Sequence, residues 1–180
     1  MWSPDKYLKN LYQSTKPKFN FDVRHMDEYS RWRDGLRETF ARDLGGFPKH
    51  KTELNTRIIE EREYPDYLLQ RVVYDGDIDL PIPAYVIKPK NSPEKLPAIV
   101  ACHGHGYGSR EIVGLNPDGT DNYGDPGYQK NFALELMRRG FLVIVPDLLG
   151  FGDRRLGEDR DKKPNDSSCH MISTYLLMLG

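Results

Sequence analysis

The sequence has few cysteines, no long apolar run and no secretion signal. Cys102 and Cys169 are its only cysteines, too few for a disulfide framework, which favours a reducing compartment. The N-terminal stretch MWSPDKYLKN lacks the basic-then-apolar signal pattern, and no apolar run approaches the roughly 18 residues that a membrane span needs. We therefore expect a cytoplasmic protein without a membrane-spanning segment.

An excess of charge is also missing. The 26 Lys and Arg residues nearly balance the 27 Asp and Glu residues, so the net charge is -1. Such a balance argues against nucleic acid or an anionic membrane as partner. A chain of 180 residues has the size of one domain and can bury a real core. The expected partner is a small molecule or another protein.

The first third of the chain has the pattern of helices. Ser3 before Pro4 is a good helix start, because the hydroxyl can accept from free backbone amides and proline fits the first helical position. A second helix is predicted from about Asp27. Its apolar stripe comprises Trp32, Leu36, Phe40 and Leu44, and Gly45-Gly46 ends it. Residues 1–66 are therefore expected to form an N-terminal helical extension.

From residue 67 the pattern changes to strands. The β-rich runs YLLQRVVYDGD and IPAYVIKPK are predicted to form a hairpin. LPAIVACHG then has the continuous apolar pattern of a strand buried on both faces, NFALELMRRG that of a compact helix, and FLVIVPD that of a second buried strand. A strand-helix-strand unit places its two strands side by side and parallel, so the expected fold class is α/β with a mostly parallel sheet.

Two arrangements of histidine and cysteine were weighed as reactive sites. His103 and His105 would point to the same face of a strand and could both bind zinc, but glycines follow where a further ligand would be needed. Cys102-His103 and Cys169-His170 place thiol and imidazole side by side. Adjacent residues face different ways on a strand or helix, so neither pair is expected to form a dyad. Cys102 is expected to be a small core residue, and no metal or cofactor is expected.

A third interpretation concerns backbone amides. When a buried strand ends in His103-Gly104-His105-Gly106, the chain turns away from the carboxyl edge of the sheet and exposes its N–H groups there. Glycine tolerates positive φ and leaves room for a substrate carbonyl. The histidine imidazole can fix this loop by hydrogen bonds without taking part in catalysis. The segment is therefore a candidate oxyanion loop.

With these residues in place, the sequence resembles the front half of the α/β-hydrolase fold, in its acetyl xylan esterase and dienelactone-hydrolase-like branch. The resemblance is carried by PAIVACHGHGYG and PDLLGFGDR and covers about residues 67–180. It implies that His103-Gly104-His105 supplies an oxyanion-hole amide, with the amides of His105 and Gly106 as candidates. It also aligns a D-x-x-G-x-G turn with Asp147, Gly150 and Gly152, in which Asp147 is expected to hold the turn. The N-terminal helices resemble an extension found in some members.

The serine nucleophile of such hydrolases is missing from the sequence. No serine lies in G-x-S-x-G, and Ser109 comes nearest with Tyr107 in place of the first glycine. His170 has no acid positioned by local spacing to orient it as a base. The resemblance places the nucleophile strand beyond the helix that begins near Cys169. Residues 67–180 are therefore expected to be a truncated domain containing its first four strands, without a Ser-Asp-His triad.

The leading functional prediction is a fragment of a serine esterase that acts on acetyl or small acyl esters and is inactive by itself. Peptidase or lactonase chemistry would use the same hole and stays an alternative. The pocket is expected to involve loop 107–130 and the charged segment 154–166. A non-catalytic binding or assembly module is the other alternative, because without the nucleophile strand the segment 97–104 would be an open, apolar sheet edge that permits self-association.

Overall fold

The computed structural model describes residues 3–48 and 50–179, which belong to two units divided after Lys49. In the first unit, helix α1 spans Asp5–Ser14 and helix α2 spans Met26–Asp43. The Ser3 hydroxyl accepts a hydrogen bond from the backbone N–H of Asp5, at 3.2 Å. Gly45 and Gly46, both with positive φ, follow the end of α2. Both helices appear where the sequence predicts them.

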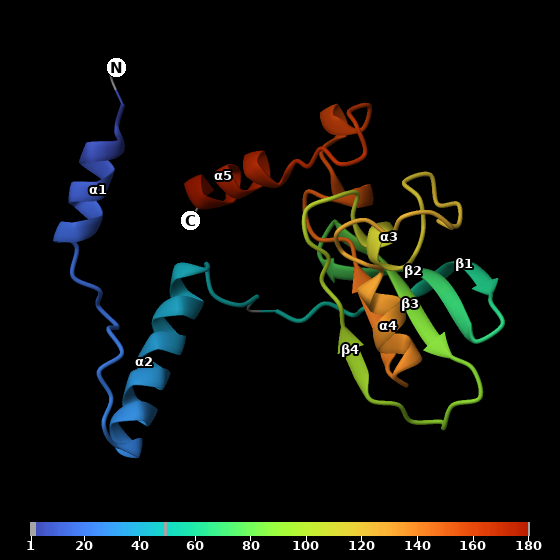
Figure 1. The fold of residues 1–180 in the computed structure, drawn as a ribbon, viewed down its shortest axis with the longest axis horizontal. Coiled ribbons are helices and arrows are strands. Elements are labelled where there is room, and N and C mark those ends of the chain that lie inside the picture. Colours follow the sequence, from blue (N-terminus) through green and yellow to red (C-terminus); the bar gives the residue numbers. More distant parts are fainter. Residues whose placement is uncertain (1–2, 49, 180) are drawn as a thin grey trace. The chain divides into compact units, whose positions relative to one another are not determined.

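The second unit contains a five-stranded sheet in the order β1-β2-β3-β5-β4 (Figure 1). Its strands are β1 (Arg57–Glu63), β2 (Tyr67–Asp77), β3 (Leu80–Pro89), β4 (Ala98–Val100) and β5 (Leu142–Pro146). Strand β5 runs antiparallel to β3 and parallel to β4. The hairpin β2-β3 and the parallel pair β4-β5 have the arrangement expected from the sequence.

The sheet begins earlier than the sequence suggests. Strand β1, RIIEERE, lies inside the segment 1–66 that was expected to be helical, and it brings the sheet to five strands instead of four. Among the described strands it pairs with β2 alone, and six of its seven residues are exposed. A strand with no buried face has no apolar alternation in its sequence, so periodicity does not reveal it.

Helix α4 (Phe132–Arg138) links β4 to β5 and completes the strand-helix-strand unit. It buries Ala133, Leu134 and Met137, and Gly140 follows its C-terminus with φ of +90°. The short helix α3 (Ser109–Ile112) closes the core from the loop after β4. The core side chains are Tyr67, Leu69, Tyr85, Ile87, Ala101, Ile112, Val113, Leu115, Ala133, Leu134, Met137, Val143 and Val145. The chain thus has the α/β fold class that the sequence predicts. The expectation of a mostly parallel sheet is wrong for the described strands, because β1, β2, β3 and β5 pair antiparallel in turn and only β4 and β5 pair in parallel.

Two short 3-10 turns, Gly152–Arg154 and Gly157–Asp159, and helix α5 (Cys169–Leu179) follow β5. Within the described residues β4 pairs only with β5, and its Val100 is 63% exposed. Helix α5 buries none of its residues. Among the described helices, none has the length and apolar character required to span a membrane.

Candidate functional site

The loop after β4 begins with alternating side chains at the carboxyl end of the strand. Ala101 and His103 are buried, whereas Cys102 between them is exposed. The prediction that Cys102 is a core residue is therefore wrong. Successive side chains of an extended chain point to opposite faces, and here the inward positions belong to its two neighbours.

His103 connects the ends of β4 and β5. Its Nε2 accepts a hydrogen bond from the backbone N–H of Leu148 at 3.1 Å, and its Nδ1 lies 2.8 Å from the carbonyl oxygen of Gly104. An imidazole that accepts at Nε2 carries its hydrogen on Nδ1, so His103 donates to Gly104. The ring of Phe151 packs edge-on against it, with centroids 5.4 Å apart. Both ring nitrogens of His103 are thereby engaged, which leaves neither for a metal ion.

Two carbonyl oxygens of the loop are held by side chains. The oxygen of Gly104 accepts from His103, and the oxygen of His105 accepts from the Tyr128 hydroxyl. The described chain has no cis peptide, and in a trans peptide the C=O and the N–H of the same unit point in opposite directions. The N–H groups of His105 and Gly106 therefore point away from the His103 and Tyr128 side chains, respectively.

These two amides have no hydrogen-bond acceptor within the described residues. Within the described residues, neither the N–H of His105 nor that of Gly106 donates to a protein acceptor. The N–H of Gly104, by contrast, donates to Gln129 Oε1 at 2.7 Å. Of the four amides in His103-Gly104-His105-Gly106, only that of Gly104 thus donates to an acceptor among the described residues, and those of His105 and Gly106 are consecutive and free.

Glu111 and Gln129 lie behind the loop at Gly106. Gly106 has φ of +149°, and a Cβ at this position would stand 1.8 Å from Glu111 Oε2 and 3.4 Å from Gln129 Nε2. Both side chains are buried, and these two polar atoms have no hydrogen-bond partner among the described residues. Only glycine fits this position, because of both its φ and the carboxyl oxygen beside it.

Asp147, at the end of β5, joins two glycine loops. Its buried Oδ1 accepts from the backbone N–H of Ser109 at 2.7 Å, and its Oδ2 from that of Asp153 at 3.3 Å. A Cβ on Gly108 or Gly152 would lie 2.7 or 2.5 Å from Oδ1. Asp147 therefore holds its own D-x-x-G-x-G turn and also the start of α3. The first glycine of that turn, Gly150, lies against the backbone of α5: a Cβ there would stand 2.8 Å from Cys169 Cα.

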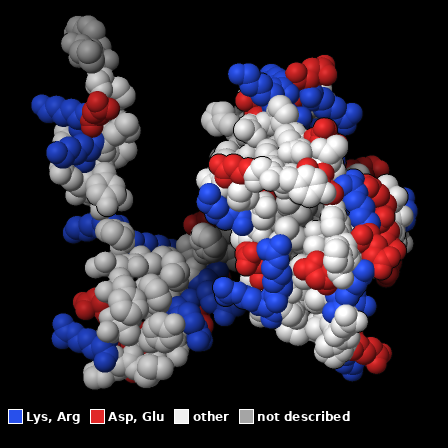
Figure 2. Space-filling view, turned by 45° about the vertical axis from the view of Figure 1, so that its right-hand side comes forward, with Lys and Arg blue, Asp and Glu red and all other residues white. Residues whose placement is uncertain are grey.

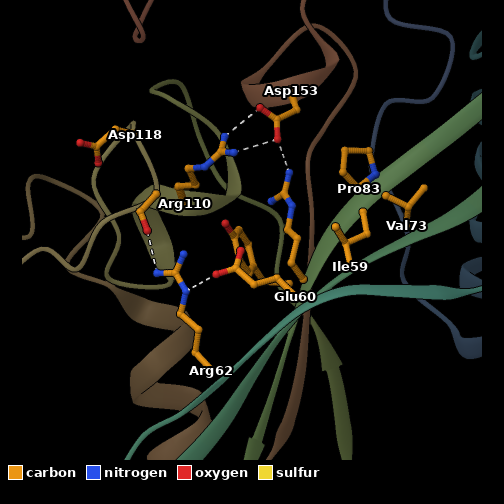
Figure 3. Close-up of a pocket in the computed structure, with 11 residues that line it drawn as sticks. Ile59, Glu60, Arg62, Val73, Pro83, Arg110, Asp118 and Asp153 are labelled. Atoms are coloured by element: carbon orange, nitrogen blue, oxygen red, sulfur yellow. Dashed lines mark hydrogen bonds and ion pairs between the residues drawn. The ribbon is translucent and has the colours of Figure 1, made fainter.

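An arginine network surrounds this aspartate. The buried Arg71 contacts Asp147 Oδ2 at 3.3 Å and also Asp153, while its guanidinium lies 4.4 Å over the ring of Tyr85. Arg110 binds both carboxylate oxygens of Asp153, each at 2.9 Å (Figure 3). Burial acts to raise the pKa of Asp153, but the hydrogen bonds and positive charges of the arginines outweigh it and lower that pKa. The network joins β2, α3 and the turn after β5.

A cavity of about 360 Å³ opens beside the network (Figure 3). Arginines and carboxylates line it together, and Arg62 donates to the carbonyl of Gly119 at 2.7 Å. A smaller cavity of about 100 Å³ is lined from both segments expected to form the pocket, 107–130 and 154–166. Its lining residues are Tyr107, Arg110, Pro117, Gly152, Asp153, Arg155 and Pro164.

The side chains weighed as nucleophile or base lie in different surroundings. Ser109 is fully buried, and its hydroxyl accepts from Arg71 at 3.4 Å. His170 is exposed on α5. Cys169 Sγ, however, lies 3.5 Å from Nε2 of His105. Sequence reasoning compared only adjacent residues and so missed this pair.

Sequence reasoning also missed the side chains that support the loop. Glu111, Tyr128 and Gln129 are isolated polar residues in a long loop, and no spacing rule connects them to residues 104–106. Arg71 did leave a signal, since it is the one charged residue of the largely apolar run YLLQRVV. A buried charge requires a partner, so such a residue indicates an ion pair within the core.

The surface of the second unit carries both signs of charge. Figure 2 shows acidic and basic side chains interspersed on the visible face. This distribution agrees with the near-balance of charged residues in the sequence.

Comparison with known proteins gives hydrolases and esterases. No protein-family model matches the chain. A Bacillus subtilis (strain 168) protein described as "Putative hydrolase YtaP" is 32% identical in an alignment of 124 residues, and the match covers 66% of this chain and 38% of that protein. A crystal structure described as a "putative acetyl xylan esterase" from Bacteroides fragilis matches with a TM-score of 0.77 and 22% identity, over 99% of this chain and 46% of that one. Acetyl Xylan Esterase 1 from Thermoanaerobacterium sp. matches with a TM-score of 0.42 and 22% identity, over 67% of this chain and 32% of that one.

The chain spans less than half the length of each of these relatives. The Bacteroides fragilis structure shows that it shares the fold of an acetyl xylan esterase, as the sequence resemblance implies. The relative in sequence carries the description "Putative hydrolase", which agrees with a hydrolase family.

Proposed function

We propose that these residues form part of a serine carboxylic-ester hydrolase for acetyl or small acyl esters, to which they contribute the oxyanion loop. The observation that carries the proposal is the pair of free N–H groups on His105 and Gly106, at the carboxyl end of a parallel strand. Ester hydrolysis develops negative charge on the carbonyl oxygen, and fixed N–H donors stabilise it. Each such donor contributes about 3 to 4 kcal/mol to transition-state stabilisation.

The surroundings of the loop support this role. Its orientation depends on His103 and Tyr128, so the donors stay fixed without a bound substrate. Preorganised donors are effective because they need no rearrangement as the charge develops. The cavity that joins the segments 107–130 and 154–166 supports a contribution to the pocket wall. The acetyl xylan esterase description of the structural relative favours acetyl esters as substrates.

The loop can be tested by its affinity for a tetrahedral anion. Methylphosphonate resembles the tetrahedral intermediate of ester hydrolysis and can be titrated into the ¹⁵N-labelled chain. The amide resonances of His105 and Gly106 should shift, whereas that of Gly104, bonded to Gln129, should not. Two hydrogen bonds to a charged group, at about 1.5 to 3 kcal/mol each, predict a dissociation constant on the order of 1 mM. Saturating anion without shifts at these two amides contradicts the proposal.

Variants of two tyrosines provide a matched comparison. Tyr128→Phe removes the donor that holds the carbonyl of His105 and should weaken phosphonate binding about two- to tenfold, the range of one net hydrogen bond. Tyr123→Phe removes a hydroxyl that bonds Asp121 in the exposed part of the same loop, and binding should be unchanged. Equal effects of both variants count against orientation of the loop by Tyr128.

Without a serine in G-x-S-x-G, these residues supply no triad nucleophile. We therefore expect no turnover of p-nitrophenyl acetate above the uncatalysed rate. Turnover that a serine-directed organophosphate abolishes would reveal an overlooked nucleophile and overturn this part of the proposal.

Self-association is a second candidate property, and the free edge of β4 favours it. Val100 on this strand is largely exposed, and α5 exposes Tyr175 and Leu176. An unpaired edge offers N–H and C=O groups to a second copy of the chain. Sedimentation at rising concentration should show a dimer or larger species, and Val100→Lys should shift it toward monomer. A monomer at every concentration contradicts this candidate.

A further inference from the structure

We propose that Cys169, paired with His105, is a nucleophilic thiol that accepts an acyl group from an activated ester. Cys169 Sγ lies 3.5 Å from His105 Nε2, within hydrogen-bonding distance for sulfur. The two residues are far apart in sequence, and they meet where α5 begins beside the loop after β4. A thiol and an imidazole in contact are the elements of a cysteine nucleophile and its base.

Several neighbours favour this pairing. The Ser167 hydroxyl donates to Cys169 Sγ at 3.1 Å, and a hydrogen bond to sulfur stabilises a developing thiolate. Phe151 packs edge-on against the His105 ring, with centroids 5.1 Å apart, and restricts its orientation. Cys169 is also the first residue of an 11-residue helix, whose N-terminal dipole favours negative charge.

The chemistry needs no group beyond the ester. Cys169 transfers its proton to Nε2 of His105, and the sulfur attacks the ester carbonyl carbon. The new C–S bond forms, the bond from that carbon to the leaving oxygen breaks, and the leaving group departs as an alcohol with the proton from His105 or as a phenolate. The product is a thioester on Cys169, formed once per chain. The step is independent of a serine nucleophile and so differs from the proposed ester hydrolysis.

Cys102 provides an internal control in the same molecule. The Cys102 thiol is exposed, whereas that of Cys169 is half-buried and therefore less accessible. Accessibility alone thus predicts faster reaction at Cys102. The full chain can be treated briefly with p-nitrophenyl acetate at pH 7, and acetylation of the two cysteine peptides compared by mass spectrometry. The proposal predicts that Cys169 is acetylated faster than Cys102. Equal rates, or faster reaction at Cys102, would overturn it.

Two histidine variants distinguish a base for Cys169 from a residue that is only adjacent to it in sequence. His105→Gln should slow acetylation of Cys169 by about tenfold or more, because the thiolate is the reacting species and its base is lost. His170→Gln alters an imidazole that is adjacent to Cys169 in sequence but makes no hydrogen bond to its sulfur among the described residues, and it should leave the rate unchanged. A far-ultraviolet circular dichroism spectrum identical to that of the original chain shows for each variant that the fold is intact, and an unchanged Cys102 rate shows that the reagent acts equally on both. No effect of His105→Gln, or equal effects of both variants, would refute the pairing.

Discussion

Replacing Asp147 by alanine should destabilise the second unit strongly. The substitution removes the acceptor for two backbone N–H groups, those of Ser109 and Asp153, and one of the two carboxylates that face Arg71. Removing one partner of a buried ion pair costs about 3 to 5 kcal/mol. Because Arg71 keeps its contact with Asp153, we expect a loss near the lower end, about 3 kcal/mol in the free energy of unfolding.

Urea unfolding followed by far-ultraviolet circular dichroism measures this loss directly. Asp161→Ala is the matched control, because Asp161 is exposed and its side chain makes no hydrogen bond or ion pair among the described residues. An exposed substitution of this kind should stay within about 0.5 kcal/mol of the original chain. A loss below about 1 kcal/mol for Asp147→Ala would refute the reasoning, because the aspartate would then not organise the two loops.

Two further predictions concern the same region. Gly106→Ala places a Cβ against Glu111 Oε2 at a positive φ and should lower the free energy of unfolding in urea by about 1 to 3 kcal/mol. Gly157→Ala is the control and should be nearly neutral, because a Cβ at Gly157 would meet no atom within 4 Å. Equal effects of the two substitutions would contradict the close approach at Gly106. Because the pKa of Asp153 is lowered in the folded chain, its stabilising contribution is complete above about pH 5 and declines as pH falls below about 4, through that lowered pKa. Urea midpoints between pH 7 and pH 3 should therefore fall less steeply for Asp153→Asn. A parallel decline in both chains would contradict the stabilisation of Asp153 by Arg110.

The sequence was sufficient for the elements with strong apolar patterns. The runs that became β3, β5 and α4 carry the period of the structure they form, and Gly140 marks the end of the helix. Strand β1 was missed because its exposed residues carry no such period. The periodicity of apolar residues thus predicts the buried elements but does not predict a strand that is held mainly by backbone hydrogen bonds.

The candidate site was only partly predictable. The spacing of Gly104 and Gly106 indicated the loop at 103–106, because the glycines that allow the chain to turn there belong to the motif itself. The residues that orient it, Tyr128 and Gln129, lie more than twenty positions away. The contact between Cys169 and His105 depends on where α5 begins in space. Contacts of this kind arise from tertiary packing, for which a single sequence has no periodic signal.

The bonds that orient the loop 104–106 have a consequence for how the site could be studied or reused. The bonds to Gly104 and His105 come from His103, Tyr128 and Gln129, all within one uninterrupted stretch of 103–129. The hydrogen bonds that direct the two free amides therefore lie within a single continuous segment, but His103 is itself fixed from the end of β5 by the N–H of Leu148 and the ring of Phe151. A graft of this site into another α/β scaffold should therefore keep its amide orientation only if the segment after β5 is transferred with the segment 103–129.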